Sequence, residues 1–114
     1  MYHNAVQMIG EFEYLILAAA TRLGDDAYGA LIRKEIESAT GGGCSIGALY
    51  TTLDRLEAKS FIRTWMGDPT PERGGRSKRR VRITPLGVKA AADFFKVMSS
   101  VSEGVPWARN QATR

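Results

Sequence analysis

The residues best suited to chemistry are cations that cluster in the second half of the chain. Residues 73–82 hold six arginines and lysines and no acidic side chain. Gly74 and Gly75 lie among them, and glycine lets a backbone approach another surface closely. Arginine guanidinium groups form paired hydrogen bonds with phosphate oxygens. The pattern therefore predicts contact with a polyanion such as a nucleic acid.

The charge of the whole chain is also distributed unevenly, with the positive excess in the same region. The net charge is +4 at neutral pH. Residues 1–54 carry 3 basic and 7 acidic groups, a net of −4, whereas residues 55–82 carry 9 and 3, a net of +6. Residues 83–114 carry 4 and 2, a net of +2. This asymmetry indicates that one part of the molecule meets the polyanion.

The composition argues against several other classes of function. The chain has 114 residues, which fits one domain, and 44% of them are hydrophobic, so it can bury a core. One histidine and one cysteine are too few for a Cys/His metal site or a redundant Ser-His-Asp triad. The sequence contains no phosphate-binding glycine loop and no evident nucleophile–base pair. We therefore expect a protein that is not an enzyme and that uses no metal or cofactor.

The sequence also gives no indication of membrane insertion or export. Its longest apolar run, residues 14–20, is far shorter than the roughly 20 residues that a membrane helix needs. The first four residues lack the basic-then-apolar layout of a secretory signal. A single cysteine excludes an internal disulfide and is consistent with a reducing compartment. These features predict a cytoplasmic protein.

Three helices are predicted ahead of the basic run. Apolar residues recur at spacings of three and four in residues 11–23, 27–40 and 45–60, as in helices with one buried side. Asp25 and Asp26 offer N-cap oxygens to the second helix, and Ser45 offers one to the third. The third helix is expected to bury Ile46, Leu49, Leu53 and Leu56. Its opposite side is then Gly47, Tyr50, Thr51, Asp54 and Arg55.

A change to alternating polarity predicts two short strands around the basic run. Residues 61–66 form the first and residues 80–84 the second, with Val81 and Ile83 on one face. They enclose a wing at about residues 67–80. Thr84 and Pro85 are an N-cap and first position for a fourth helix over residues 86–103, and residues 104–114 are expected to be a flexible tail. The fold class is mainly α with a small β-hairpin, in the order of a winged helix-turn-helix.

At several places the chain resembles the PadR family of transcriptional regulators. A Tyr-Gly pair at 28–29 opens the second helix, and Gly-Ala-Leu-Tyr at 47–50 lies in the third. Arg-Leu-Glu follows at 55–57, and a glycine-containing basic wing at 74–80 precedes Thr-Pro-Leu-Gly at 84–87. The resemblance covers about residues 10–95. It departs from the family pattern at Ser60, where glycine is common, and at Arg80-Val81, which replaces a common aromatic pair.

The resemblance implies a winged-helix DNA-binding protein, usually a repressor, that works as a homodimer. Within a single domain of residues 1–114, residues 10–84 would form the DNA-binding core. Residues 85–103 would form a C-terminal dimerisation helix, assisted by the N-terminal helix. A two-fold dimer places its recognition helices about one DNA turn apart, which suits a near-palindromic operator.

Two sets of residues are predicted to contact DNA. Small side chains, hydroxyls and an arginine suit a recognition helix in the major groove, and a basic wing suits phosphates or the minor groove. The recognition-helix set is Ser45, Gly47, Tyr50, Thr51 and Arg55. The wing set is Arg73, Arg76, Lys78, Arg79 and Arg80. Asp54 does not suit a phosphate backbone and is expected to pair with Arg55, Lys59 or a neighbouring helix.

The fourth helix is expected to serve two surfaces, because it carries apolar residues on more than one face. One face belongs to the core, and the other is predicted to meet the symmetry-related copy. The predicted dimer interface is Phe12, Ala90, Phe94, Val97 and Val101. The alternative is that both faces pack within one chain.

A different class of function also fits this order of elements, namely a winged-helix module that binds another protein and reads no DNA sequence. Such modules usually lose the charge of the wing, whereas this chain concentrates it. Replacing the wing cations with alanine separates the two readings, because binding to a protein partner would survive. The residues for this test are Arg76, Lys78, Arg79 and Arg80.

Three further residues have both a functional and a structural interpretation. Trp65 and Trp107 could stack on a flat small-molecule effector, or they could pack as ordinary side chains. Cys44 precedes a predicted helix, where a lowered thiol pKa would allow it to sense oxidants, or it fills space as a small side chain. For Trp65 and Cys44 the packing interpretation is favoured, and Trp107 lies in the predicted tail.

Overall fold

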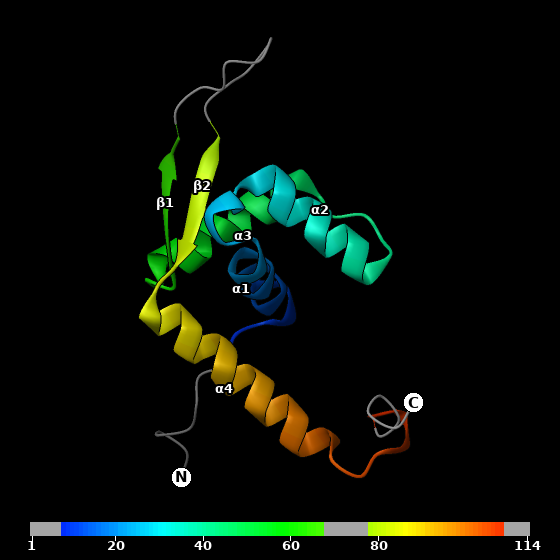
Figure 1. Ribbon diagram of the computed structural model, residues 1–114. Helices are drawn as coiled ribbons and strands as arrows, with labels where there is room; N and C mark the ends of the chain where they lie inside the picture. The colour runs from blue at the N-terminus through cyan, green and yellow to red at the C-terminus, as the bar shows by residue number, and fades with distance from the viewer. Residues whose placement is uncertain (1–7, 68–77, 109–114) are drawn as a thin grey trace.

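The computed structural model describes residues 8–67 and 78–108, and Figure 1 shows how their elements are arranged. Three helices pack together beside a two-stranded hairpin. A long fourth helix begins at the end of the hairpin opposite its loop and extends in the other direction. The elements, in chain order, are α1 (Glu11–Leu23), η1 (Gly24–Asp26), α2 (Gly29–Thr40), α3 (Ile46–Ala58), β1 (Ile62–Met66), β2 (Arg79–Ile83), α4 (Pro85–Ser102) and η2 (Pro106–Ala108). The predicted order of helices and strands is confirmed.

The second helix begins later than its sequence predicts. Asp25 and Asp26 lie in the 3-10 turn η1, and α2 starts at Gly29 with Tyr28 as an extended N-cap. The cause is a contact with β2: the Val81 N–H donates to the Ala27 carbonyl at 2.9 Å. Tyr28 also forms an isolated antiparallel bridge with Arg80. Pairing with the hairpin therefore holds residues 27–28 in an extended conformation that a helix cannot use.

The third helix confirms the predicted N-cap and corrects one buried position. Ser45 accepts a hydrogen bond from the Ala48 N–H at 3.2 Å. The three predicted leucines are buried, but Ile46 is 55% exposed and Thr52 takes the remaining inward position. Thr52 is accommodated because its hydroxyl donates to the Ala48 carbonyl at 2.8 Å. Ile46, the first residue of the helix, lies outside the packed part of the bundle.

The hairpin pairs in antiparallel register from Ile62 opposite Ile83 to Met66 opposite Arg79. Val81 and Ile62 point into the core, as the alternation predicts, and each is almost fully buried. The segment between the strands includes Arg73 and Arg76, which lie outside the described residues. The hairpin is thus anchored by its apolar face against the helices.

The core forms where α1, α2, α3 and the hairpin meet. Its largest fully buried side chains are Ile16, Leu17, Ile32, Leu49, Leu53, Leu56 and Ile62. Helix α4 packs on this core through its first half, where the Phe94 ring stacks on Tyr14 of α1 at 4.9 Å. Thr84 caps α4 by accepting from the Gly87 N–H at 3.1 Å, as predicted. In the tail, residues 106–108 form the turn η2, whereas residues 109–114 lie outside the described part.

Glu13 links α1 to the end of α3 and makes stability depend on pH. Its side chain is buried and accepts from the Gly10 N–H at 2.8 Å and from Lys59 Nζ at 2.9 Å. Burial raises the pKa of this carboxyl, but the two hydrogen bonds and the lysine charge outweigh burial and hold the pKa below its ordinary 4.5. A lowered carboxyl pKa adds stability that is present above the ordinary value and lost as pH falls through the folded value.

We therefore expect Glu13→Gln to reduce the free energy of unfolding at neutral pH. The difference in this free energy between the variant and the wild type should become smaller below about pH 4.5. Urea unfolding at neutral pH and at several acidic pH values measures the difference. Glu11→Gln is the control, because Glu11 lies in the same first turn and is exposed. A difference that stays constant across this range would contradict the prediction.

Ser60 adopts a backbone conformation that normally favours glycine. It follows α3 with φ of 65°, and the helix ends with the Phe61 N–H on the Leu56 carbonyl and the Ser60 N–H on the Glu57 carbonyl, both at 2.9 Å. This pair of bonds is the Schellman pattern, in which a left-handed residue reverses the chain. The turn forms with serine, at the energetic cost of a side chain at positive φ.

We expect Ser60→Gly to raise the free energy of unfolding by about 0.5–1 kcal/mol, since relief of the left-handed strain exceeds the added chain entropy. The Thr84 hydroxyl, which donates to the Ser60 carbonyl at 2.7 Å, keeps its partner in this variant. Urea unfolding gives the shift. Ser38→Gly, inside α2, is the control and should instead lose about 0.5 kcal/mol. A destabilised Ser60→Gly variant would refute the strain argument.

Candidate nucleic-acid interface

The candidate interface combines the exposed side of α3 with residues 78–82 of the hairpin. Of the predicted recognition-helix set, Ser45, Gly47, Thr51 and Arg55 are exposed. Gly47 and Thr51 lie one helical turn apart, and among the described residues only the Ser45 hydroxyl would come within 4 Å of a Cβ at position 47. The N-terminal part of α3 therefore presents a narrow surface of small and hydroxyl-bearing residues next to the exposed Ile46.

Tyr50 has a different position from the one its spacing predicts. It is half-buried, and its ring packs so closely over Gly29 of α2 that a Cβ there would lie 2.9 Å from Cζ of the tyrosine. The guanidinium of Arg79 lies 5.8 Å from the centre of the same ring. Tyr50 therefore joins α2, α3 and the hairpin, and only part of its side chain faces solvent. This close approach requires glycine at position 29. The Tyr-Gly pair at 28–29 and the Gly-Ala-Leu-Tyr motif at 47–50 are therefore in direct contact.

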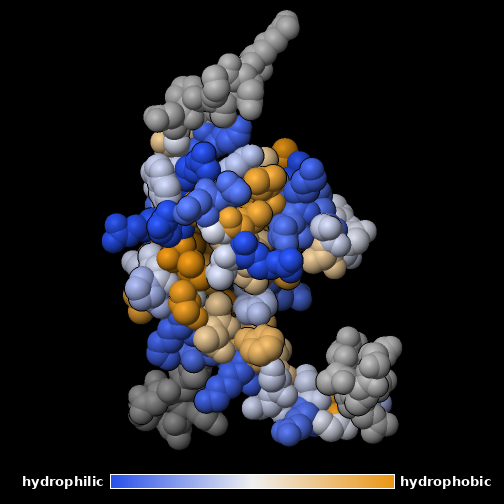
Figure 2. Space-filling model, viewed as in Figure 1, coloured by the Kyte–Doolittle hydropathy of each residue, from blue (hydrophilic) through white to orange (hydrophobic). Residues whose placement is uncertain are grey.

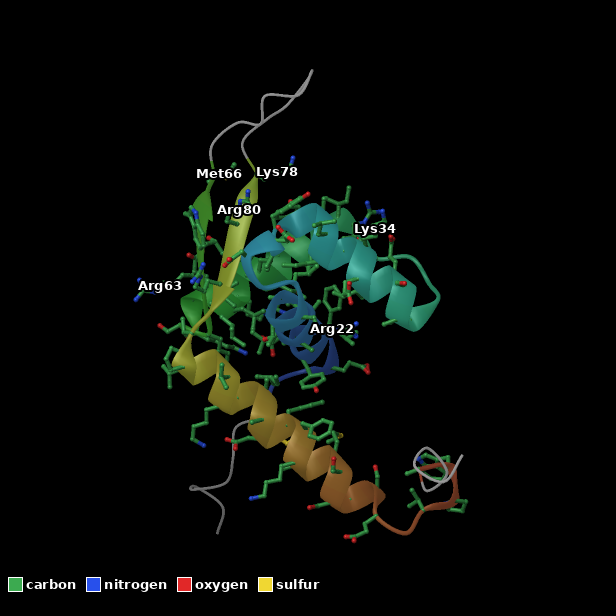
Figure 3. All side chains as sticks on the ribbon, in the orientation of Figure 1. Arg22, Lys34, Arg63, Met66, Lys78 and Arg80 are labelled. Carbon is green, nitrogen blue, oxygen red and sulfur yellow. The ribbon has the colours of Figure 1, made fainter. Side chains whose placement is uncertain are left out.

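The described cations in residues 78–82 lie over aromatic rings. Lys78 Nζ and the Arg80 guanidinium lie 5.2 and 5.3 Å from the centre of the Tyr28 ring. Arg80 also donates to the Asp25 carbonyl at 3.2 Å. Arg82, which is exposed, lies 5.9 Å from the Trp65 ring. Figure 3 shows Arg80 on β2 and Lys78 just before the strand, on the side of α2. The sequence supplied the cations, but Tyr28 was expected as the opening of the second helix, and its position beneath them was missed.

Arg79 points to the other side of β2, toward α3. Its guanidinium lies 2.9 Å from an oxygen of Asp54 and 3.3 Å from one of Glu57. The expectation that Asp54 pairs with Arg55, Lys59 or another helix is therefore wrong. The partner is on a strand 25 residues away, because β2 crosses beside the exposed turns of α3. In Figure 2, hydrophilic side chains gather over the described part of the hairpin, and hydrophobic side chains are visible beside them.

The remaining candidate residues do not converge on a second site. Trp65 lies on β1 and Trp107 on η2, at opposite ends of the molecule (Figure 1). Cys44 is buried, and burial followed by the charge of Glu37 raises the pKa of its thiol, which favours the packing interpretation over an oxidant sensor. Within residues 8–67 and 78–108, no cluster of three or more histidine, cysteine or acidic side chains could hold a metal, and no helix is long and apolar enough to span a membrane.

The predicted dimer residues divide between the core and the surface. Phe12, Ala90 and Phe94 pack on the core of their own chain, Val97 is half-buried, and Val101 is 72% exposed. Leu86 and Val88 are exposed at the start of α4, and the exposed apolar residues of its distal half include two that the prediction omitted, Phe95 and Met98. The apolar surface available on α4 is therefore rotated from the predicted one, because the stacking of Phe94 on Tyr14 fixes which side of the helix faces inward.

Solved structures of other proteins share this arrangement. A transcriptional regulator from Clostridium thermocellum is 27% identical, and the match covers 79% of this chain and 84% of that chain with a TM-score of 0.62. A PadR family transcription regulator from Clostridium difficile is 23% identical over 82% and 95%, with a TM-score of 0.64. F93 from STIV, a winged-helix DNA-binding protein, is 21% identical over 88% and 97%, with a TM-score of 0.59. These likenesses confirm the winged-helix fold.

The family comparison agrees with the fold. A search of curated proteins found no match. The model of the transcriptional regulator PadR-like family matches residues 16–93, which is more than half of the chain. The matched span includes α2, α3 and both strands, and so covers the candidate interface. Its family and fold are those of DNA-binding regulators. This chain therefore belongs to the PadR-like family of transcriptional regulators.

Proposed function

We propose that this protein represses transcription in the cytoplasm by binding a near-palindromic operator as a homodimer. The observation that carries the proposal is that the exposed side of α3 and the hairpin cations are held together: Arg79 lies over the Tyr50 ring of α3, while Lys78 and Arg80 lie over Tyr28 at the start of α2. Membership of a family of DNA-binding regulators supports double-stranded DNA as the partner. Residues 10–84 would supply the DNA-binding core and residues 85–103 the dimer contact.

In this proposal the start of α3 enters the major groove. Gly47 lets the backbone approach base edges, and the Thr51 hydroxyl, one turn later, can donate to or accept from them. Ser45 keeps the helix end rigid through its cap and Arg55 reaches a phosphate from the next turn. The half-buried Tyr50 contributes mainly by fixing α3 against α2.

The wing would contact the DNA backbone through cations held above aromatic rings. Tyr28 orients Lys78 and Arg80, so less side-chain entropy is lost when each binds a phosphate. Arg73 and Arg76 are proposed to extend the same contact. Each phosphate neutralised releases condensed counterions, so the affinity for DNA should fall steeply as salt rises.

The proposed dimer forms through the distal half of α4. Phe95, Met98 and Val101 are exposed there and form an apolar surface that water disfavours. A two-fold axis through this helix pairs the same surface of both copies. This version of the interface replaces Ala90 and Phe94, whose side chains pack on the core, with Phe95 and Met98.

A titration with DNA from upstream of the protein's own coding sequence tests the proposal. Fluorescence anisotropy should show tight binding that an excess of unrelated duplex does not displace, with two protomers per site by analytical ultracentrifugation. Binding that is equal for all duplexes, or absent at low salt, would rule out an operator-binding repressor. Capture of a protein partner that survives alanine replacement of Lys78 and Arg80 would support the interaction-module alternative.

A further inference from the structure

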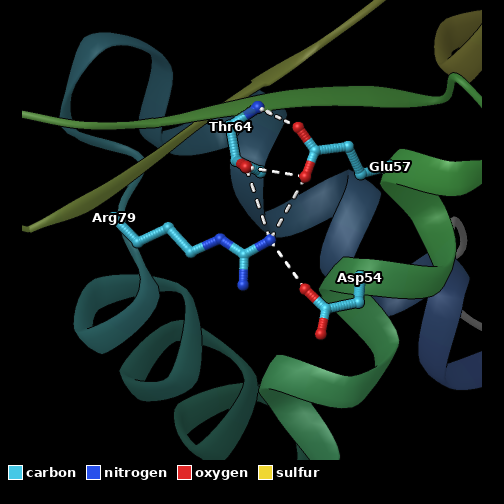
Figure 4. Close-up of polar contacts among 4 residues, drawn as sticks. All are labelled: Asp54, Glu57, Thr64 and Arg79. Carbon is cyan, nitrogen blue, oxygen red and sulfur yellow. Dashed lines mark hydrogen bonds and ion pairs between the residues drawn. The ribbon is translucent and has the colours of Figure 1, made fainter.

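A polar cluster joins the proposed recognition helix to both strands of the hairpin, as Figure 4 shows. Arg79 is its centre, and the side chain is only 19% exposed. Its Nη2 donates to Asp54 Oδ1 at 2.9 Å, to Glu57 Oε1 at 3.3 Å and to Thr64 Oγ1 at 3.3 Å. One nitrogen of one wing arginine is therefore shared by two carboxylates of α3 and a hydroxyl of β1.

Glu57 closes the cluster from the other direction. Its carboxylate accepts from the Thr64 N–H at 3.0 Å and from the Thr64 hydroxyl at 2.8 Å. The hydrogen bond from the Thr64 hydroxyl, together with its N–H and the charge of Arg79, outweighs burial and lowers the pKa of Glu57. Glu57 is therefore ionised at neutral pH, and α3 is connected to β1 and β2 through charged hydrogen bonds.

The cluster lies next to the surface that is proposed to meet DNA. Asp54 follows Gly47 and Thr51 at the seven-residue and three-residue spacings that place side chains on one helix face. Its carboxylate is 71% exposed. A carboxylate at this position repels phosphates unless a cation neutralises it. Arg79 is the cation in contact with it among the described residues.

Arg79 differs in this respect from the other described cations of β2. Lys78 and Arg80 lie above the Tyr28 ring on the α2 side, and Arg82 is exposed near Trp65. None of these three has an ion pair with α3. Arg79 alone among them is directed at the recognition helix and largely removed from solvent.

We propose that Arg79 is a positioning residue and not a phosphate ligand: its positive charge is shared between Asp54 and Glu57, offsets their repulsion of DNA and holds the hairpin strands at a fixed angle to α3. The proposal rests on the proposed DNA-binding function and removes one residue from the predicted set of DNA contacts. In this proposal, an Arg79 variant loses affinity for DNA because two carboxylates beside the DNA lose their cation. No phosphate contact is lost.

A double-mutant cycle separates the two roles. Arg79→Ala should weaken binding of the labelled upstream duplex about 10-fold in the wild-type background, because both carboxylates become unpaired. In the Asp54→Asn, Glu57→Gln background the same change should cost less than about 2-fold. Dissociation constants measured at several salt concentrations give a second readout. The slope of log affinity against log salt should be unchanged by Arg79→Ala, whereas losing a phosphate contact lowers it by about 1.

Lys89→Ala is the matched control, because it also removes one positive charge and one ion pair, with Asp93 at 2.8 Å on α4. It should leave the affinity within about 2-fold of the wild type. An equal loss from Arg79→Ala in both backgrounds, with a smaller salt slope, would overturn the positioning role and make Arg79 a phosphate ligand. Failure of the wild type to bind the duplex would overturn the proposed function, and this proposal with it.

Discussion

Gly47→Glu is expected to abolish operator binding while making the protein more stable. The substitution places a carboxylate at the exposed start of α3, where the proposed interface approaches DNA most closely. Its charge and its bulk both oppose the contact, and juxtaposed like charges cost several kcal/mol. We therefore expect the affinity for the upstream duplex to fall at least about 100-fold, as measured by fluorescence anisotropy.

The same substitution should raise the free energy of unfolding by about 1 kcal/mol. A Cβ at position 47 meets nothing closer than the Ser45 hydroxyl at 3.8 Å, so the side chain fits. Glutamate forms helix better than glycine, and a negative charge in the first turn interacts favourably with the helix dipole. Urea unfolding measures this gain and shows that lost binding is not lost folding.

Ser38→Glu is the control for this pair of measurements, because it adds the same charge at an exposed position of α2. Its affinity for DNA should stay close to that of the wild type. If Gly47→Glu binds the duplex as well as the control does, α3 is not the element that enters the groove. Because the variant should bind DNA more weakly and yet unfold less readily, a loss of folding cannot account for the loss of binding.

Gly87→Ala adds a single methyl group and is expected to lower the free energy of unfolding strongly. Gly87 is buried in the first turn of α4. A Cβ on it would lie 2.8 Å from Cγ1 of Ile83 and 3.0 Å from the backbone carbon of Phe61. The backbone there is fixed, because the Thr84 N–H donates to the Phe61 carbonyl at 3.0 Å. The added methyl can be accommodated only if α4 moves away from the hairpin.

We expect Gly87→Ala to lower the free energy of unfolding by about 3 kcal/mol, the upper end for an overpacked core. Because native domains have only about 5–15 kcal/mol in total, the thermal midpoint should fall by about 10 °C or more. Gly47→Ala is the matched control, since it adds the same methyl to the first turn of another helix, in open space, and should be stabilising. Equal stability of the Gly87→Ala variant and the wild type would contradict the packing argument.

The sequence was sufficient for features that depend on neighbours a few residues apart. The spacing of apolar residues predicted α1 at its observed bounds, and the hydroxyls of Ser45 and Thr84 marked the starts of α3 and α4 correctly. The alternation in β2 placed Val81 inside the core. These features are local because capping and helical periodicity operate over one turn, and strand alternation over two residues.

The chain's own sequence thus determined the order of the elements, the family and the presence of a concentrated positive charge. Only the tertiary structure decided how those charges are used. Pairing with β2 delays the start of α2, and the same strand directs Arg79 to Asp54, 25 residues earlier in the chain. Such contacts depend on which elements pack side by side, and no periodicity within one element records that. The structure therefore divides the described cations at residues 78–80 into two held over Tyr28 and one arginine bound to the recognition helix.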